Sequence, residues 1–466
     1  MFRLLTILVI LFACVCSQAQ TSFRIYDSDL LPAAFHKKRR EALRQLMPEN
    51  SVAFIFSLPV KKRSNDVFYE YQQNPNLYYL TGYKEPHSVL VLFKEYQNLD
   101  SIQTNEILFV QPSDSLTELW NGKRIGEQNA RKILEIEHVY PNYTFPDFHL
   151  DFSRFSEILY DIPEESCTDD PNDRGDLYSL IKHFKLKADT LLQFHSYLYF
   201  KDLMAQLREV KTNEELTLLI NAIDYTCEGI RELMAVLKPG MHEYEVEAVV
   251  EYIFKKNGAE YPGFPSICGG GENSCILHYT DNRKQLKEGE LVVVDVGAEY
   301  HGYTADVTRT LPVSGKFSEP QKAIYELVLK AQQKGIEACV PGNKFWDPGR
   351  IAKDIIARGL LELGIIKEYG EVTRYFMHGT SHYLGLDVHD VGTYTELKPG
   401  NVITVEPGIY IPEGSPCDPK WWNIGIRIED DVLITDHSPE VLSNCVPKTP
   451  EMIEVFMKKH AVYLKE

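Results

Sequence analysis

The sequence contains no long hydrophobic segment beyond its first twenty residues. A helix that crosses a membrane needs about 20 consecutive apolar residues to span about 30 Å of hydrocarbon. The mainly apolar stretch from Leu4 to Cys16 is shorter than this, and no later stretch approaches that length. We therefore expect no transmembrane segment.

The sequence is also poor in positive charge. Lysine and arginine together number 49 against 67 aspartates and glutamates, and the formal net charge is -18 at pH 7. This charge repels phosphate backbones and anionic membrane surfaces, which argues against nucleic acid and lipid as partners. The basic run from His36 to Arg40 is followed by residues of mixed charge and is interpreted as a solvated helix face.

The sequence has nine cysteines but no CxxC motif. Cys14 and Cys16 lie in the N-terminal apolar stretch, and the other cysteines are scattered along the chain. This pattern excludes a zinc ribbon and a dense disulfide framework. A few bridges stay open, including one between Cys268 and Cys275, and the sequence does not decide the pairing.

The N-terminus has the pattern of an export signal. Arg3 supplies a positive start, the apolar stretch follows, and Ser17-Gln18-Ala19 offers small residues suited to cleavage after Ala19. We expect a signal peptide at residues 1 to 19 and an exported protein, either periplasmic or secreted. An alternative stays open, because Leu11 to Cys14 resembles a bacterial lipobox, in which Cys14 would be lipidated and anchor the protein.

The length and ordinary globular composition indicate two domains, with no tandem repeat and no low-complexity tract. In the first half, short apolar runs and helical periodicity predict a compact α/β domain. Its strands are expected at residues 51 to 56, 88 to 93 and 106 to 112, and its helices at 33 to 46 and 126 to 136. A polar loop at 163 to 176 is followed by amphipathic stretches, so we expect the domain boundary near 185 to 210.

The second half reads as an antiparallel sheet backed by helices. The segment Leu291 to Val313 has the pattern of a hairpin, and Lys238-Pro239-Gly240 is a clear helix stop. Helices are expected at residues 213 to 237, 243 to 256, 321 to 340 and 349 to 363, and further strands at 401 to 410 and 423 to 435.

Four acidic residues interrupt strands that are otherwise apolar: Asp295, Asp306, Glu406 and Glu429. A lone buried carboxylate costs several kcal/mol or becomes protonated, so each needs a cation or a hydrogen-bond donor. Taken singly, each acid could end a strand or form a salt bridge, as Glu429 could with Arg427 two residues earlier on the same strand face.

The stretch HGTSHYLGLDVHD, residues 378 to 390, holds three of the 14 histidines. A histidine-rich loop together with four strand acids is the pattern of a dinuclear hydrolase, in which two ions share bridging carboxylates and one imidazole.

Several segments resemble the pita-bread metallopeptidases and, within them, the aminopeptidase P (Xaa-Pro aminopeptidase) family. In the second half the resemblance rests on NSCILHYTDN (273 to 282), VVVDVGAEYHGYTADVTRT (292 to 310), MHGTSHYLGLDVHDVG (377 to 392), VITVEPGIYIP (402 to 412) and NIGIRIEDDVLIT (423 to 435). In the first half it rests on NPNLYYLTGYKEPHSVLVL (74 to 92) and ELWNGKRIG (118 to 126).

The resemblance implies an α+β protein with two folded domains. Residues 20 to 185 would form a creatinase/aminopeptidase P-like α/β domain, 186 to 210 a helical linker, and 211 to 466 a pita-bread catalytic domain. This last domain is expected to be an antiparallel sheet backed by helices.

The resemblance also implies the roles of the site residues. Asp295 and Asp306 would hold one metal ion, and His382 and Glu406 the other, with Asp306 and Glu429 bridging. Glu406 would also carry a proton to the leaving nitrogen, and Arg427 would support the bridging carboxylates. The outer histidines, which would contact substrate and stabilise the tetrahedral intermediate, are His278, His378 and His389.

The implied activity is hydrolysis of the bond between an N-terminal residue and a penultimate proline, by two divalent ions. Manganese is the expected metal, and Co²⁺ or Zn²⁺ stays open. The alternatives are a prolidase, which accepts only Xaa-Pro dipeptides, and a non-catalytic peptide-binding protein. The partners expected are peptides with proline second and further copies of the chain, as a dimer or tetramer.

Two further features are ambiguous in the sequence. The run CGGGENSC (268 to 275) lacks the ending of a phosphate-binding loop and is expected to be a loop that shapes the substrate entrance. The adjacent Trp421 and Trp422 belong either to a packed loop or to a wall of the substrate pocket.

Overall fold

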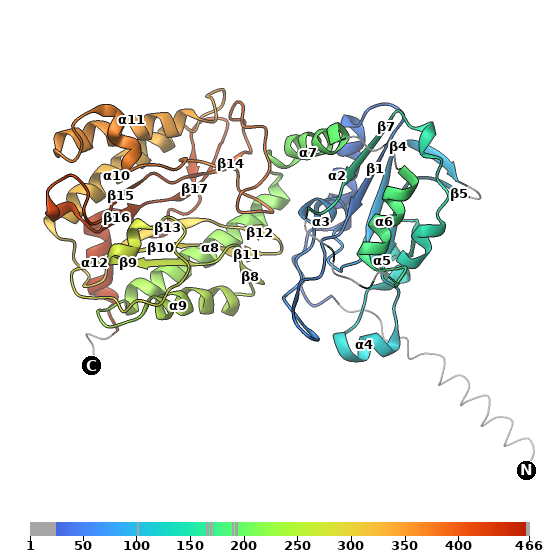
Figure 1. Ribbon diagram of the computed structural model, residues 1–466, viewed down its shortest axis with the longest axis horizontal. Coiled ribbons are helices and arrows are strands. Elements are labelled where there is room, and N and C mark those ends of the chain that lie inside the picture. The colour runs from blue at the N-terminus through green and yellow to red at the C-terminus, as the bar shows by residue number, and fades with distance from the viewer. Residues whose placement is uncertain are drawn as a thin grey trace, which may run out of the picture. The chain divides into compact units, whose positions relative to one another are not determined.

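A computed structural model describes residues 25–99, 102–164, 167, 170, 172–188, 191 and 194–462 (Figure 1). The predicted signal peptide and the candidate lipidated Cys14 lie outside the described residues. Over the part that is described, no helix has both the length and the apolar character that crossing a membrane requires. The chain divides into two compact units, up to Phe200 and from Lys201 onward.

The first unit is built on one mixed five-stranded sheet with the strand order β6-β5-β4-β1-β7. The elements of this unit are α2 (Ala33–Leu46), β1 (Ser51–Phe56), β2 (Lys62–Ser64), β3 (Val67–Phe68), α3 (Pro75–Thr81), β4 (Val89–Leu99), β5 (Ile102–Val110), α4 (Ser115–Asn121), α5 (Gly126–Ile133), β6 (Val139–Pro141), β7 (Glu157–Asp161) and α6 (Leu177–Ala188). The division between the units falls within the next helix, α7 (Phe194–Arg208). Strand β1 runs parallel to β7 and antiparallel to β4.

Aromatic side chains form the core on one face of this sheet. Phe54 and Phe56 of β1 point to the same face because they are two residues apart. The ring of Phe184 on α6 lies 4.6 Å from that of Phe54 and 5.4 Å from that of Phe56. The expected α/β domain is confirmed in its three central strands and in α2. The interpretation of His36 to Arg40 as a solvated face is wrong for His36 and Arg40, which are buried, and only Lys37 and Lys38 are exposed.

The second unit contains the remaining helices and strands. They are α8 (Asn213–Val236), α9 (Glu243–Lys256), β8 (Tyr261–Pro262), β9 (Ile267–Gly270), β10 (Leu291–Val296), β11 (Ala298–Tyr300), β12 (Tyr303–Thr304), β13 (Val307–Pro312), α10 (Glu319–Glu337), α11 (Asp347–Glu362), β14 (Val402–Val405), β15 (Gly408–Ile411), β16 (Ile424–Arg427), β17 (Asp430–Leu433), β18 (Glu440–Val441) and α12 (Pro450–His460).

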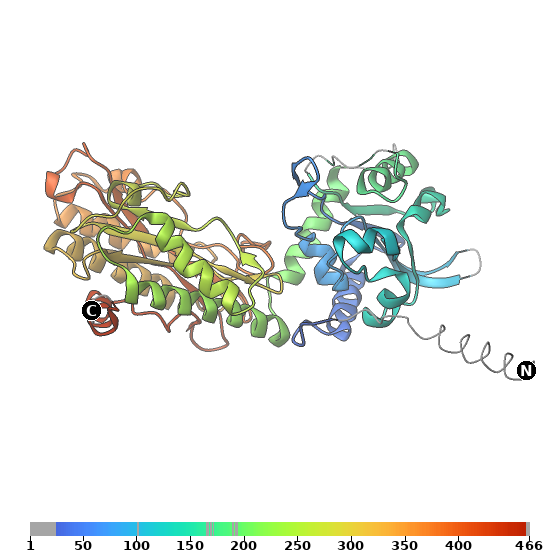
Figure 2. The same ribbon diagram turned by 90° about the horizontal axis from the view of Figure 1, so that it is seen from below.

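Every strand pairing described in the second unit is antiparallel. The strands form the groups β13-β10-β9, β12-β11-β8, β14-β17-β18 and β15-β16. Helices α8 and α9 lie side by side, as Figures 1 and 2 show, and contact strands β8, β9, β11, β12 and β13. Helix α10 contacts α11 and strands β14 to β16. The predicted antiparallel sheet backed by helices, with a hairpin over residues 291 to 313, is confirmed.

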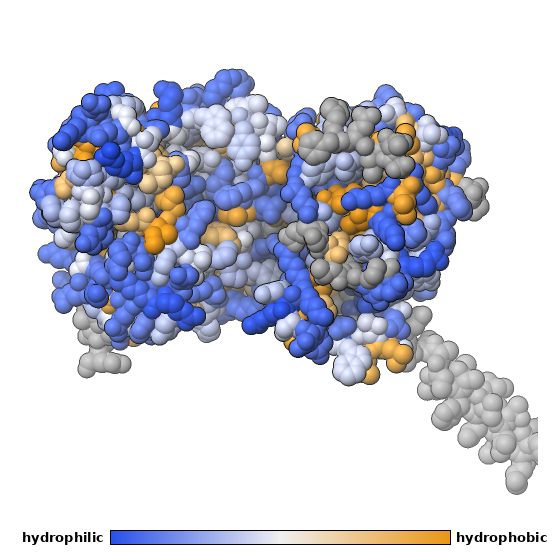
Figure 3. All heavy atoms as spheres, in the orientation of Figure 1, coloured by the Kyte–Doolittle hydropathy of each residue, from blue (hydrophilic) through white to orange (hydrophobic). Residues whose placement is uncertain are grey.

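Local sequence explains where the helices begin. Thr212 and Glu215 exchange side-chain and backbone hydrogen bonds in a capping box at the start of α8, and Ser318 and Gln321 do the same at α10. Thr449 caps α12, which begins with Pro450. The exposed face seen in Figure 3 is covered mostly by hydrophilic residues, in keeping with the charge-rich composition.

The run CGGGENSC differs from the loop that we expected, because its first residues form the buried strand β9. A Cβ atom at Gly270 would lie 2.1 Å from Leu286 Cδ2, so only a residue without a side chain fits there. Gly269 and Gly270 therefore serve close packing in a strand, whereas Gly271 follows the strand with a φ of 57°. Helices α3 and α12 were also missed, although Asn74-Pro75 and Thr449-Pro450 are recognisable helix starts.

Gly297 brings two of the candidate site residues together. It lies two residues after Asp295, and a Cβ atom at this position would be 1.7 Å from the carbonyl oxygen of Ala305, which precedes Asp306. The backbones at these points approach more closely than any side chain allows. A glycine here is thus a condition for placing Asp295 beside Asp306.

We expect Gly297→Ala to lower the free energy of unfolding by about 3 kcal/mol, because the added methyl group forces the two backbones apart. Urea denaturation measures the change. The matched control is Gly370→Ala, where a Cβ atom would meet nothing within 4 Å. Equal stability of the two variants would contradict the assigned close approach.

Candidate metal centre

The nine residues that the sequence singled out line one cavity in the second unit. This cavity has a volume of about 580 Å³. Its polar wall contains His278, Asp295, Asp306, His378, His382, His389, Glu406, Arg427 and Glu429. Its apolar wall contains Phe264, Pro265, Ile267, Leu277 and Val388. The sequence therefore identified the whole polar wall except Thr280 and Ser381.

Strand pairing brings the four acids to this cavity. Asp295 lies in β10 opposite Thr308 of β13, two residues beyond Asp306. Glu406 follows β14 and Glu429 precedes β17, and these two strands pair at Val405 and Asp430. The backbone N–H of Glu429 donates to the carbonyl of Thr308 at 3.1 Å, which joins the two pairs of strands.

The oxygen and nitrogen atoms of three residues gather at one point. Candidate ligand atoms of Asp306, His382 and Glu429 all lie within 4.8 Å of one another. His382 Nε2 is 3.5 Å from Asp306 Oδ2 and 3.6 Å from Glu406 Oε1, which is too far for a hydrogen bond. His382 Nδ1 lies 3.1 Å from the carbonyl oxygen of Tyr383. An Nδ1–H donated there leaves the Nε2 lone pair directed at the acids.

The acids are buried together with too little positive charge to neutralise them. Burial, and then the charge of neighbouring carboxylates, raises the pKa values of Asp306 and Glu429 well above their ordinary range. Burial also raises the pKa of Glu406, to about 7. Arg427 is the only arginine or lysine among the described lining residues, and its Nη2 pairs with Asp295 Oδ2 at 2.5 Å.

Two carboxylate oxygens of this cluster have no hydrogen-bond donor within the described structure. They are Asp295 Oδ1 and Asp306 Oδ1, and both are buried. Unsatisfied buried carboxylate oxygens beside an oriented imidazole are the ligands that divalent cations take. The residues present therefore fit a metal centre.

Comparison with known proteins agrees with this geometry. Residues 217–436 match the model of metallopeptidase family M24, and residues 36–156 match the aminopeptidase P N-terminal domain. An Xaa-Pro aminopeptidase of Haemophilus influenzae is 36% identical over 444 residues, which cover 93% of this chain and 99% of the relative. The chain belongs to metallopeptidase family M24. The human Xaa-Pro aminopeptidase 3 is 34% identical, with 89% of this chain and 82% of the relative covered.

Solved structures of M24 relatives have the same fold. Escherichia coli aminopeptidase P with the inhibitor Pro-Leu superposes with a TM-score of 0.82 at 34% identity, covering 92% of this chain and 99% of that chain. Pseudomonas aeruginosa aminopeptidase PepP gives a TM-score of 0.81 at 33% identity, covering 93% and 99%. The expected fold class, an aminopeptidase P N-terminal domain followed by a pita-bread domain, is therefore confirmed.

The three outer histidines of this M24 site are not equivalent. His378 uses both ring nitrogens, because Nε2 lies 2.8 Å from Tyr410 Oη and Nδ1 lies 2.6 Å from the carbonyl oxygen of Gly379. Burial, and then the charge of Arg427, lowers the pKa of His378 to about 4, so the ring is neutral. The ring of His389 lies 4.5 Å from that of His382 and faces the cavity, as His278 does.

The suggested salt bridge between Glu429 and Arg427 is wrong. Arg427 pairs with Asp295, and Thr308 Oγ1 donates to Glu429 Oε2 at 2.6 Å. Thr308 also accepts from Arg427 Nε at 3.3 Å, and so links the two groups. Thr308, two residues after Asp306 and inside β13, was not identified from the sequence.

Tyr410 was missed as well. Its hydroxyl accepts from Arg427 Nη1 at 2.9 Å, and its proton is then available to His378. Tyr410 lies in the buried strand β15, where an aromatic ring is expected for packing alone, so only the structure reveals the role of its hydroxyl.

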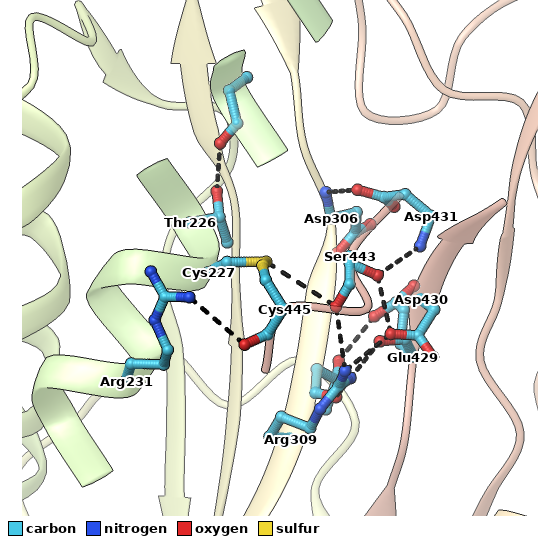
Figure 4. The surroundings of a disulfide bond; sticks show 12 residues. Thr226, Cys227, Arg231, Asp306, Arg309, Glu429, Asp430, Asp431, Ser443 and Cys445 are labelled. Carbon is cyan, nitrogen blue, oxygen red and sulfur yellow. Dashed lines mark hydrogen bonds and ion pairs between the residues drawn. A yellow bond between two sulfur atoms is a disulfide. The ribbon is translucent and has the colours of Figure 1, made fainter. Parts of the chain in front are cut away.

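Polar residues that do not line the cavity form hydrogen bonds next to Asp306 and Glu429 (Figure 4). The backbone N–H of Asp306 donates to the carboxylate of Asp431 at 3.2 Å. Ser443 Oγ donates to Asp430 at 2.7 Å and accepts from the N–H of Asp431 at 3.1 Å. Burial acts to raise the pKa of Asp430, but Arg309 and Lys448 outweigh it and lower this pKa to about 2. The run Glu-Asp-Asp at 429 to 431 was a signal for these residues.

A disulfide joins Cys227 of α8 to Cys445, two residues after Ser443 (Figure 4). The alternative bridge between Cys268 and Cys275 is wrong, because both are free thiols. Trp421 is buried, and neither it nor Trp422 lines the cavity, so the packed-loop interpretation is favoured.

In chelator-treated protein we expect Asp306→Asn to raise the free energy of unfolding by about 1 to 3 kcal/mol, because it removes one charge from a crowded buried cluster. Thermal or urea denaturation with chelator present measures the effect. Asp224→Asn, at an exposed position of α8, is the control and should change stability by no more than about 0.5 kcal/mol. A less stable Asp306→Asn protein would show that the carboxylates do not repel one another.

Proposed function

We propose that this protein is a dinuclear-metal aminopeptidase that releases the N-terminal residue from peptides with proline second. The observation that carries the proposal is the convergence of four acids, in or next to strands, and His382 on one cavity. Its support in sequence is the match to an Xaa-Pro aminopeptidase of Escherichia coli, 36% identical with 90% of this chain and 97% of the relative covered. No observation favours a prolidase.

The residues that would hold two divalent ions are Asp295, Asp306, His382, Glu406 and Glu429, with Asp306 and Glu429 shared between the ions. Oxygen-rich ligation with one imidazole favours manganese and also suits cobalt or zinc. An Escherichia coli aminopeptidase P has been solved in a zinc-substituted form with product. When bound, such ions supply Lewis-acid activation of water and of a carbonyl group.

The side chains of the cavity would then direct the proton transfers. Glu406 takes the proton of the attacking water and passes it to the leaving imino nitrogen. One of its oxygens lies 3.6 Å from His378 Nδ1 and the other 3.6 Å from His382 Nε2. His278 and His389, which face the cavity, donate to the carbonyl oxygen as negative charge develops there.

The apolar wall would accept the substrate side chains. Phe264, Pro265 and Val388 provide a surface that suits the proline ring, next to polar groups that orient the peptide bond. We further propose that the protein assembles as a dimer or tetramer, and the support for this is the family resemblance.

We expect the purified protein to hydrolyse an Xaa-Pro-Yaa tripeptide, to lose activity with chelator and to regain it with Mn²⁺. Asp306→Ala and Glu429→Ala should show only the activity of the chelated enzyme and a reduced metal content, since each lacks a shared ligand. Liquid chromatography of the products and elemental analysis measure these effects.

The exposed-site variant Asp224→Asn serves as the control and should keep full activity. Cleavage of an Xaa-Pro dipeptide without cleavage of the tripeptide would replace the proposal with a prolidase. Metal binding with no cleavage of either peptide would replace it with a peptide-binding protein.

We also propose that the protein is exported, to the periplasm or beyond the cell. The support is the signal-like pattern of residues 1 to 19 and the Cys227–Cys445 disulfide, since such bridges persist in oxidising compartments. Lipid anchoring through Cys14 is the alternative route.

Peptide mapping of protein from fractionated cells should find the mature N-terminus after Ala19 and the bridge between Cys227 and Cys445. A lipid-modified N-terminus at Cys14 would decide for anchoring. Recovery of the uncleaved chain with reduced cysteines in the cytoplasmic fraction would contradict export.

A further inference from the structure

The loop that carries His389 contains a buried carboxylate that the proposed mechanism does not use. Asp390 follows His389 directly, is 2% exposed and does not line the cavity. Its carboxylate contacts two cations, Lys211 Nζ at 3.2 Å and the guanidinium of Arg208. A buried ion cluster of this kind requires matched charges, since removal of one member leaves another uncompensated.

Both cations lie in one short segment, since Arg208 is the last residue of α7 and Lys211 lies two residues before α8. The side chains of Arg208 and Lys211 are 3% and 1% exposed. The backbone N–H of Lys211 donates to the carbonyl of Gly400 at 2.8 Å, which fixes the segment to the turn before β14. Glu209, between them, accepts from the N–H of Thr393 at 2.8 Å. The segment from Arg208 to Lys211 therefore contacts the chain just after His389 at two points, Asp390 and Thr393.

A backbone hydrogen bond between the residues that follow His382 and His389 closes the loop that carries both histidines. The N–H of Asp390 donates to the carbonyl of Tyr383 at 2.9 Å, and these two residues form an isolated β-bridge. Tyr383 follows His382 as Asp390 follows His389. The bridge thus sets the spacing of the two imidazole rings, whose centroids are 4.5 Å apart.

A glycine makes room for the ion cluster inside the loop. A Cβ atom at Gly385 would lie 2.1 Å from Asp390 Oδ2 and 3.0 Å from Lys211 Cε. The carboxylate and the lysine stem therefore occupy the space in which a side chain at Gly385 would lie. Asp390, Arg208 and Lys211 do not line the cavity, and the chain neighbour of Asp390 that does line it is His389.

We propose that Asp390, held by Arg208 and Lys211, is a positioning residue that fixes His389 beside His382. The proposal rests on the proposed aminopeptidase function, in which His389 contacts the reacting carbonyl. The segment from Arg208 to Lys211 thus supplies the two cations that hold this histidine in place.

A double-mutant cycle tests the proposal, using cleavage of an Xaa-Pro-Yaa tripeptide with Mn²⁺. We expect Asp390→Asn to lower kcat by about 10- to 100-fold with KM and Mn²⁺ content nearly unchanged, as loss of an orienting carboxylate does elsewhere. His389→Ala should lower kcat further. Adding Asp390→Asn to His389→Ala should change nothing more, because the residue through which Asp390 acts is already absent.

Two further variants protect the test against a folding defect. Arg208→Lys keeps the positive charge but loses the planar fork, and it should lower kcat in the same non-additive way with a smaller loss of stability. The matched control is Asp161→Asn, since Asp161 is a buried carboxylate of the first unit that accepts from Asn74 and Asn76. It should lower stability and leave kcat unchanged.

Multiplied losses in the double variant, or unchanged kcat in Asp390→Asn and Arg208→Lys, would overturn the positioning role. A wild-type protein that does not cleave the tripeptide would instead overturn the proposed function. In that case the ring resonances of His389 still test the positioning by NMR. They should shift in Asp390→Asn and stay in place in Asp161→Asn, and an unshifted His389 would refute the proposal.

Discussion

Mutual repulsion among Asp295, Asp306, Glu406 and Glu429 is the constraint on which the catalytic unit depends. These side chains are held around one cavity, and burial together with the charge of neighbouring carboxylates raises the pKa values of Asp306, Glu406 and Glu429. Arg427, the one arginine or lysine on the described lining, is paired with Asp295. The fold therefore forces carboxylates together and leaves their charge to be balanced from outside the chain, which is the physical basis of a metallopeptidase site.

The rest of the second unit supplies the rigidity that this crowding requires. Arg309 and Lys448, which could otherwise neutralise the cluster, form ion pairs with Asp430 instead. Asp430 lies one residue beyond Glu429. The carboxylate of Asp431 accepts a hydrogen bond from the backbone N–H of Asp306, and the side chain of Asp306 faces the cavity. In the same way, His382 and His389 are held through their neighbours Tyr383 and Asp390. Support reaches the functional side chains mostly through adjacent residues and backbone groups.

Sequence patterns predicted the polar wall of the site because buried acids in apolar strands are conspicuous, and because the resemblance carried residue types with their spacing. They did not reveal Thr308, Tyr410, Asp431 or Ser443, whose roles arise from pairings between segments more than 100 residues apart or between separate strands. Strand β9 was missed because three glycines suggest a loop, whereas Gly269 and Gly270 lie in the strand and pack closely against the backbone of Asn273 and the side chain of Leu286. Pairing of the cysteines likewise needed coordinates, since spacing alone offered Cys268 and Cys275.

The bridge between Cys227 and Cys445 closes a loop of 218 residues, which contains every residue of the cavity wall. The residues of the cavity wall thus all lie within one covalently closed ring. A single peptide-bond cut anywhere inside that ring leaves both fragments joined and still in register. One nick therefore does not separate the strands that hold the acids, and two cuts are needed to release a piece of this ring.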